Sequence, residues 1–218
     1  MKIAIFSASL GNMDQVEAHV PQSIPYDYFL YTDENMPPRF NSMTPRLQAK
    51  IPKFFPWQLH PGYDYYMWID GNLTMTNPDS LKWFLEQCQD SDIVVLNHPR
   101  RNTVKLEADF IAGRLKRGCS YITPRYENEL LQEQMNEINA DKDFVDDALY
   151  CGGVFIYKNT TETQKMMKDW WHHSSRYFIM DQLAFPYLLK KHNLKVNARP
   201  EVYFKNPYIK HKNHVKKI

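Results

Sequence analysis

Residues 63–72, YDYYMWIDGN, decide the expected fold, because an apolar and aromatic run ends there in an acidic turn. A strand this apolar is typical of one buried on both faces of a sheet, so Asp70 would lie at the carboxyl edge, where α/β folds bind ligands. Gly71 allows a sharp bend, and Asn72 brings a second oxygen toward the same point. This spacing indicates a site for Mg²⁺ or Mn²⁺, which prefer oxygen ligands. The alternative interpretation is a plain turn.

Length and composition indicate one globular unit. The chain has 218 residues, 43% of them hydrophobic and 14% aromatic, so it can bury a sizeable core. We find no linker rich in Pro, Gly or Ser and no internal repeat with a period of about 20–50 residues. A single domain is therefore expected.

The charge of the chain is nearly balanced. The net charge is +2, and residues 205–218 contribute five lysines, two histidines and no acidic residue. The rest of the chain carries 22 Lys and Arg against 25 Asp and Glu, so a nucleic-acid partner is not expected.

The opening residues lack the features of a membrane span or an export signal. Residues 1–9 are apolar but too short to cross a bilayer, and they lack the layout of a signal peptide. The three cysteines, Cys88, Cys119 and Cys151, are odd in number and lack metal-ligand spacing, which indicates reduced thiols. A cytoplasmic location is expected.

Strand-like and helix-like segments alternate along the chain. Strands are expected at residues 2–7, 26–31, 65–69, 92–97, 153–157 and 195–197. Helices are expected at residues 45–54, 78–87, 105–117, 125–139, 161–173 and 181–192. This order predicts a Rossmann-like α/β fold with a mainly parallel central sheet, helices on both faces, and a site along the carboxyl edges of the strands.

The loop after the first strand has no phosphate-binding glycine pattern. Residues 7–12 read SASLGN, which fits neither the dinucleotide-binding fingerprint nor a P-loop. This argues against a Rossmann dehydrogenase, a P-loop kinase and a sugar-nucleotide nucleotidyltransferase. A metal ion that neutralises a diphosphate is another way for such a sheet to bind a nucleotide.

Several blocks of sequence, in their order and spacing, resemble one family. The blocks are KIPK at 50–53, WIDGN at 68–72, NHPR at 97–100, WW at 170–171 and DQLAF at 181–185. They resemble hexosyltransferase-like domains of plants and bacteria and, more broadly, GT-A glycosyltransferases, including those encoded by large DNA viruses of algae. The resemblance covers roughly residues 1–189.

The resemblance implies an activity and a division of the chain. A single GT-A-like domain over residues 1–218 would use Mn²⁺ or Mg²⁺ to transfer a hexose from a nucleotide-diphosphate sugar, a UDP-sugar in our interpretation, to a hydroxyl of a glycan. Residues 1–100 would form the donor half, 101–204 the acceptor half and 205–218 a basic tail. The chain could be a module of a longer glycosyltransferase. If the protein is viral, the expected cytoplasmic location would be the cytoplasm of the host cell.

The metal ligands are expected from two parts of the chain. Asp70 and Asn72 would supply oxygens, although Asn72 replaces the commoner second acidic residue. The resemblance adds a C-terminal histidine, His211 or His214, with Lys212 or Lys216 facing the phosphates. The alternative for the histidines is a C-terminal tail that contacts nothing. The alternative for Asn72 is that it marks lost metal affinity, so that the chain is a catalytically inactive carbohydrate-binding domain.

A catalytic base is needed if the transfer inverts the sugar configuration. Asp181 is the leading candidate, followed by Asp147 and its neighbour Asp146. Asp181 opens an expected helix, so its alternative role is a helix cap, and the other two can be surface acids. If the transfer retains configuration, none of them need act as a base, and the sequence does not decide between the two outcomes.

The nucleotide is expected across the ends of the first two strands. Base and ribose would meet Ser7, Ala8, Thr32 and Asp33, and the phosphates would meet Arg46 and Lys50, which lie one helical turn apart. The segment at Thr32 can also be a simple polar turn. Other candidates for the donor pocket or for stacking on sugars are His98, Arg100, Trp68, Trp170 and Trp171, although tryptophan in apolar runs is more often core.

Overall fold

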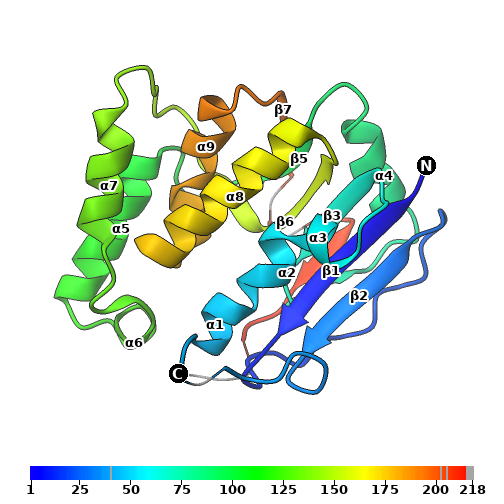
Figure 1. Cartoon of the computed structure of the whole chain (residues 1–218), viewed down its shortest axis with the longest axis horizontal. Helices are drawn as coiled ribbons and strands as arrows, with labels where there is room; N and C mark the ends of the chain where they lie inside the picture. Colours follow the sequence, from blue (N-terminus) through cyan, green and yellow to red (C-terminus); the bar gives the residue numbers. More distant parts are fainter. Residues whose placement is uncertain (40, 202, 205, 215–218) are drawn as a thin grey trace.

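A six-stranded sheet in the order β2-β1-β3-β6-β5-β7 forms the centre of the computed structural model, which describes residues 1–39, 41–201, 203–204 and 206–214 (Figure 1). The strands are β1 Ile3–Ser9, β2 Asp27–Thr32, β3 Tyr65–Ile69, β5 Ile93–Asn97, β6 Tyr150–Lys158 and β7 Val196–Arg199. All run in one direction except β6, which is antiparallel to both β3 and β5. The mainly parallel sheet expected from the sequence is confirmed.

Both faces of the sheet are covered, because its central strands are apolar on both sides. Along β1 and β3, Phe6 and Trp68 belong to one buried cluster, whereas Ile5 and Met67 belong to the other. This alternation follows from the period of two residues in a strand. The expected helices on both faces are therefore present.

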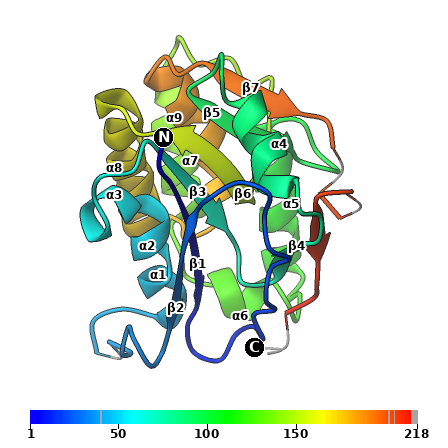
Figure 2. The same ribbon diagram turned by 90° about the vertical axis from the view of Figure 1, so that its right-hand side faces the viewer.

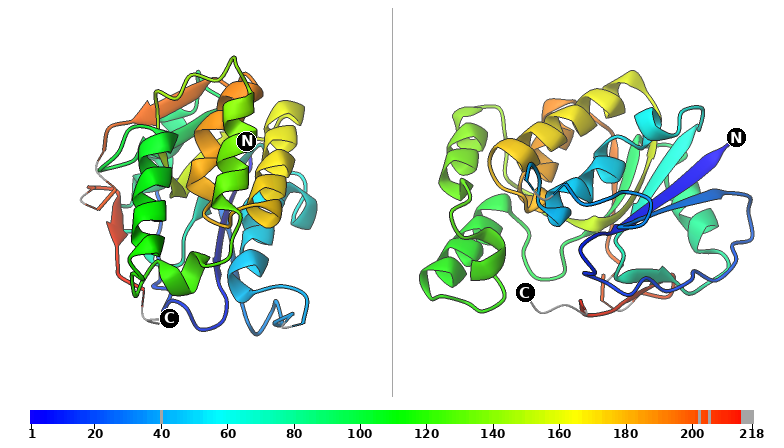
Figure 3. Two further views of the ribbon diagram at one scale, coloured as in Figure 1. Left: turned by 90° about the vertical axis from the view of Figure 1, so that its left-hand side faces the viewer. Right: turned by 60° about the horizontal axis from the view of Figure 1, so that its bottom comes forward.

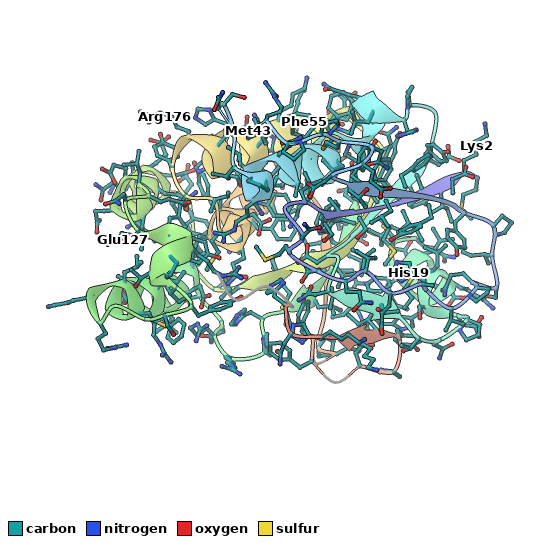
Figure 4. All side chains as sticks on the ribbon, turned by 90° about the horizontal axis from the view of Figure 1, so that it is seen from below. Lys2, His19, Met43, Phe55, Glu127 and Arg176 are labelled. Carbon is teal, nitrogen blue, oxygen red and sulfur yellow. The ribbon has the colours of Figure 1, made fainter. Side chains whose placement is uncertain are left out.

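The helices divide between the two faces and one end of the molecule (Figure 2). Helices α1 to α3, α8 and α9 lie on one face, α4 lies on the other, and α5, α6 and α7 stand together at one end (Figure 3). Figure 4 places Glu127 and Arg176 toward this end and Lys2 at the opposite end. Among the described residues, no helix combines the length and apolar character needed to cross a bilayer. The helices are α1 Pro45–Gln48, α2 Lys50–Phe54, α3 Pro56–Leu59, α4 Ser80–Gln87, α5 Val104–Lys116, α6 Thr123–Tyr126, α7 Leu131–Ala140, α8 Thr161–Arg176 and α9 Phe185–Lys191.

Three of the expected helices are interrupted. The helix expected at residues 45–54 divides into α1 and α2, because Pro52 has no N–H to continue the hydrogen-bond ladder. The helix expected at 125–139 is broken near Asn128, whose φ of 65° is incompatible with a right-handed helix. The helix expected at 181–192 begins as a 3-10 turn, Asp181–Leu183, and the α-helix α9 starts only at Phe185, with Pro186 in its first turn.

The C-terminal segment contains a strand that the sequence analysis missed. Residues Ile209–His211 form β8, which pairs antiparallel with β4, Leu73–Met75, in a separate two-stranded sheet. Ile209 is only 1% exposed and belongs to the same buried cluster as β4. The alternative of a tail that contacts nothing is therefore wrong for this part. Lys216 lies outside the described residues.

Replacing Ile209 by Ala tests whether this strand stabilises the domain. Loss of a buried isoleucine side chain is expected to lower the free energy of unfolding by about 2–5 kcal/mol, measured by urea denaturation. Lys210→Ala is the control, because Lys210 is exposed on the same strand, and its effect should stay within about 0.5 kcal/mol. Equal effects of the two substitutions would contradict the burial of β8.

Candidate active site

A cavity of about 350 Å³ opens at the carboxyl ends of β1, β3 and β5. Ala8, Asp70 and His98 line it from these three strand ends. Because β6 runs in the opposite direction, it contributes its amino end, with Gly152 and Gly153, to the same edge. The cavity therefore lies at the edge of the sheet where the sequence analysis expected a site.

Asp181 and two lysines form a buried cluster of charges in this cavity. Asp181 Oδ2 lies 2.6 Å from Lys50 Nζ and 2.5 Å from Lys53 Nζ. The Lys53 ammonium also donates to the carbonyl of Gly152 at 2.7 Å. These side chains are only 14% (Lys50), 3% (Lys53) and 11% (Asp181) exposed. Each group has partners, as buried charges require.

Burial and charge oppose each other in this cluster. Burial by itself would raise the pKa of the Asp181 carboxyl, but the two lysines outweigh it and lower the pKa to about 2. Burial lowers the pKa of the Lys50 ammonium, against the opposing influence of Asp181. Asp181 is therefore an ionised carboxylate at neutral pH.

The local structure explains why these three residues meet. Lys50 and Lys53 are three positions apart, so both project from one face of α2. Asp181 opens a 3-10 turn whose position depends on Trp170, because the indole N–H of Trp170 donates to the Asp181 carbonyl at 2.8 Å. The Asp181 side chain makes no helix-capping hydrogen bond, so its interpretation as a cap is wrong.

Asp70 lies directly after β3 and beside the charged cluster. Its Oδ1 accepts the indole N–H of Trp68 at 2.7 Å, and its own N–H donates to the carbonyl of Gly153 at 2.8 Å. The pKa of the Asp70 carboxyl is raised above its ordinary value, mainly by burial. Lys53 opposes this rise, and the nearby Asp181 adds to it. Within the described part of the chain, the second carboxylate oxygen, Oδ2, is left available for a ligand.

The glycine pair makes room for the two carboxylates. A Cβ atom on Gly152 would lie 2.8 Å from Asp181 Oδ1, and one on Gly153 would lie 2.8 Å from Asp70 Oδ2 and would overlap the Tyr203 hydroxyl. Atoms that are not bonded to each other do not approach a real Cβ so closely. Only glycine at both positions allows β6 to pass between the two acids.

Asn72 serves the C-terminal segment rather than the cavity. Its Nδ2 donates to the carbonyl of Lys212 at 3.0 Å and lies 3.3 Å from His211 Nε2. The N–H of Lys212 in turn donates to the Asn72 carbonyl at 2.9 Å. Neither Asn72 nor His211 lines the cavity. Burial lowers the pKa of His211, and His214 lowers it further.

Of the other two C-terminal candidates, His214 reaches the cavity and Lys212 does not. His214 lines the cavity, with its Nδ1 2.6 Å from Asp14 Oδ1, and Asp14 lines the cavity too. Lys212 pairs with the exposed Glu17 and lies outside the lining, and its hydrogen bond helps to lower the pKa of Glu17.

Two side chains that line the cavity, those of Asp70 and His214, carry donor atoms of the kinds that divalent cations use. Within the described ranges, no group of three or more His, Cys, Asp or Glu side chains is placed to hold a metal. Asp70 and His214 nevertheless line one cavity and offer one carboxylate and one imidazole. Mg²⁺ is typically held by one or two protein carboxylates together with water and substrate phosphates. This donor set suits an ion that a diphosphate helps to bind.

The expected nucleotide residues are only partly brought together. Ala8, Arg46 and Lys50 line the cavity, whereas Ser7 is fully buried in β1. Asp33 is not among the residues that line the cavity, and its Oδ1 accepts the N–H of Gly11 at 2.9 Å, which shapes the loop after β1. Thr32 ends β2, and its carbonyl closes the turn that follows.

Asp147 and Asp146 lie away from the cavity. The exposed carboxylate of Asp147 pairs with Lys190 at 2.6 Å. Asp146 accepts the N–H groups of Val104 at 2.7 Å and Lys105 at 2.8 Å, which lie at the amino end of α5.

Several lining residues were not predicted as site residues. The spacing of KIPK was a signal for Lys53, whereas no local pattern indicated the others. These unpredicted lining residues include Met13, Lys53, Tyr121, Arg125, Tyr126, Gln182, Tyr203 and Phe204. Trp68 also lines the cavity, whereas Trp170 is fully buried in the core and Arg100 lies over the ring of Phe204.

The fold is GT-A-like, with a cavity at the carboxyl edge of its mainly parallel sheet. The crystal structure of a glycosyltransferase involved in the glycosylation of the major capsid of the virus PBCV-1 has the same fold, with a TM-score of 0.52, 9% sequence identity, and coverage of 100% of this chain and 95% of that chain. The structure of A197 from STIV aligns with a TM-score of 0.40 and 13% identity over 100% of this chain and 98% of that chain.

The family is shown by the sequence match. The TOD1/MUCI70 glycosyltransferase-like domain matches residues 39–215, and the chain belongs to this family. No curated protein matches the chain.

Replacing Asp181 by Asn tests the charged cluster. The substitution leaves two buried ammonium groups without their carboxylate, so the free energy of unfolding at pH 7 is expected to fall by about 3–5 kcal/mol in urea denaturation. Asp147→Asn removes an exposed ion pair instead and should cost at most about 1 kcal/mol. Similar losses in the two variants would contradict the role of the cluster.

The wild-type protein and Asp181→Asn also give a test of pH dependence. Folding lowers the pKa of Asp181 from its ordinary value of 3.8 to about 2. Such a carboxyl stabilises the fold above its unfolded pKa and loses this contribution as the pH falls through the folded value. The stability difference between the wild-type protein and Asp181→Asn should therefore be complete above about pH 5 and shrink between about pH 4 and 2. A constant difference over that range would contradict the lowered pKa.

Proposed function

We propose that this domain is a metal-dependent glycosyltransferase that transfers a hexose from a UDP-sugar to a hydroxyl of a glycan. One observation carries the proposal: Asp70 and the cluster of Lys50, Lys53 and Asp181 line one cavity at the ligand-binding edge of a GT-A-like sheet. Membership of a glycosyltransferase-like family supports the same class of reaction.

The chemistry of the reaction matches the charges in the cavity. Breaking the bond between the anomeric carbon and the diphosphate leaves negative charge on the phosphates and positive charge on the sugar. Arg46 and Lys50 line the cavity as cations that can bind the phosphates. A divalent cation bound by Asp70 and His214 would neutralise further charge on the leaving group. The backbone near Ala8 also lines the cavity and would meet the nucleotide.

Two aromatic side chains support a carbohydrate as the acceptor. Tyr121 is 51% exposed and Phe204 is 49% exposed, and both line the cavity. The guanidinium of Arg125 lies 4.1 Å from the centre of the Tyr121 ring. Exposed rings next to hydrogen-bond donors present an apolar face together with polar partners, which is the combination that a sugar ring requires.

A binding domain without catalytic activity is the second candidate. Two features of Asn72 favour it. This residue stands where a second acidic residue is common at such turns, and its side chain bonds to the C-terminal segment, so the turn offers Asp70 no second ligand beside it. Such a domain would bind oligosaccharides but would neither bind UDP with a metal nor turn over a UDP-sugar.

Calorimetric titration of UDP, with and without Mn²⁺, tests the donor site. Wild-type protein is expected to bind UDP more tightly with Mn²⁺, and Asp70→Asn should weaken that binding about 10- to 100-fold, as loss of a metal-site group does. Asp64→Asn is the matched control, because Asp64 lies at the opposite end of the same strand with a side chain that is 59% exposed.

The outcomes separate the parts of the proposal. UDP binding that is independent of Mn²⁺ and unchanged in Asp70→Asn would contradict the metal site alone. No binding of UDP or of any UDP-sugar, with or without Mn²⁺, would contradict the transferase function and favour the binding domain.

A further inference from the structure

We propose that Glu107, a buried carboxylate outside the cavity, is a positioning residue that turns the amide oxygen of Gln182 toward a hydroxyl group of the transferred sugar. This inference rests on the proposed function and adds to it a residue that recognises the sugar. Gln182 lines the cavity next to Asp181, whereas Glu107 does not line it. The hydrogen bonds that connect the two side chains carry the argument.

Glu107 is held in one position by an ion pair. It lies in the first turn of α5, and its side chain is only 4% exposed. Its Oε2 accepts the Nε–H of Arg101, and the Arg101 guanidinium lies 4.0 Å from the ring centre of Phe110. A buried carboxylate needs a charged partner of this kind. The two oxygens of Glu107 therefore have fixed directions, one toward Arg101 and the other toward the cavity wall.

The second oxygen of Glu107 fixes the direction of the Gln182 amide. Gln182 Nε2 donates to Glu107 Oε1 at 2.5 Å. A carboxylate paired with a guanidinium only accepts hydrogen bonds, whereas a glutamine amide has a donating nitrogen and an accepting oxygen. Only the nitrogen can therefore face Glu107, so Gln182 Oε1 is directed away from it.

The amide oxygen of Gln182 is left for a ligand. Within the part of the chain that the structure describes, no group donates a hydrogen bond to Gln182 Oε1, and this oxygen is not among the polar atoms that are shielded from solvent. An accepting oxygen in the wall of a cavity is matched by a ligand group that donates a hydrogen bond. On a hexose, the hydroxyl groups are such donors.

Asp181 supplies a second accepting oxygen beside Gln182. Its Oδ2 accepts hydrogen bonds from the two lysines of the cluster, whereas its Oδ1 lies next to Gly152, where the missing Cβ leaves space. Over the described ranges, Oδ1 has no hydrogen-bond donor either. Accepting oxygens on two consecutive residues fit a sugar ring that presents unsubstituted hydroxyl groups to this wall.

The position of this wall favours the transferred sugar as the ligand. Gln182 follows Asp181, whose Oδ2 lies 2.6 Å from Lys50 Nζ. In the proposed function Lys50 binds the phosphates, and the transferred sugar is attached directly to the second of them. A sugar on phosphates at Lys50 would lie beside the turn that carries Gln182.

The turn is also held from its other side. The indole N–H of Trp170 donates to the Asp181 carbonyl at 2.8 Å, and Trp170 is fully buried. Glu107 on α5 and Trp170 on α8 therefore fix the turn between them. A hydrogen bond to an amide that is already oriented loses less side-chain entropy on binding, so this arrangement favours recognition of the sugar.

The test compares the binding of UDP-hexoses with the binding of UDP. Calorimetry with Mn²⁺ gives the dissociation constants, and the ratio between UDP and the UDP-hexose that binds most tightly measures the preference for the sugar. Gln182→Leu should lower this preference about 2- to 10-fold, the size of one hydrogen bond, and leave UDP binding unchanged. An unchanged preference would overturn the inference, and so would a wild-type protein that binds no UDP-hexose more tightly than UDP.

A double-mutant cycle tests the positioning role of Glu107. Glu107→Gln allows the amide of Gln182 to turn round, because an amide at position 107 can accept as well as donate. It should lower the preference for the sugar in the wild-type background and have no further effect when Gln182→Leu is already present. A general structural effect would instead weaken UDP binding and add to the effect of Gln182→Leu, and this result would overturn the positioning role.

Asp109→Asn is the matched control, because Asp109 lies on the same helix with a side chain that is 60% exposed. It should leave both dissociation constants unchanged. If thermal unfolding shows that Glu107→Gln does not fold, the double variant Arg101→Met, Glu107→Leu takes its place, because it removes both charges of the buried pair together.

The outcomes separate this inference from the proposed function. Failure of the wild-type protein to bind UDP or any UDP-hexose would overturn the proposed function and the inference with it. Binding of UDP with a sugar preference that neither Gln182→Leu nor Glu107→Gln changes would overturn the inference alone.

Discussion

The Asp181 carboxylate, held between the ammonium groups of Lys50 and Lys53, is the interaction on which the site depends. Three charges in a buried position are tolerated only when all of them have partners, because moving ions out of water is unfavourable. Lys53 meets this condition through a second hydrogen bond, to the carbonyl of Gly152 at 2.7 Å. The cluster therefore holds α2, the amino end of β6 and the 3-10 turn at Asp181 together, and these segments shape the cavity.

Tryptophan side chains of the core hold that cluster in position. Trp170 is fully buried and donates its indole N–H to the Asp181 carbonyl at 2.8 Å. The Lys53 ammonium lies 5.5 Å from the ring centre of Trp170 and 5.5 Å from that of Trp68. Trp68 donates in turn to Asp70. Both acids of the site are thus oriented by the apolar core, which is rigid because it is closely packed.

The reversed strand β6 brings residues from distant parts of the chain together at the cavity. Its amino end carries Gly152 and Gly153 to the edge where the parallel strands end, and the missing side chains leave space for two carboxylates. The C-terminal segment then packs on the opposite face through β8, fastened by Asn72, so that His214 reaches the same cavity. One opening therefore collects residues from nearly the whole length of the chain.

The sequence by itself determined the six strands of the central sheet, most helices and the position of Asp70 at the edge of the sheet, because strand and helix periodicity and the acidic turn are local properties. It also singled out Lys50 and Asp181 individually. Only the tertiary structure decided that Lys53 and Asp181, which are 128 residues apart, form a buried ion pair, and that Asn72 binds the C-terminal segment and not the cavity. Such pairings depend on how the elements pack, and no local pattern in the chain encodes the distance between them.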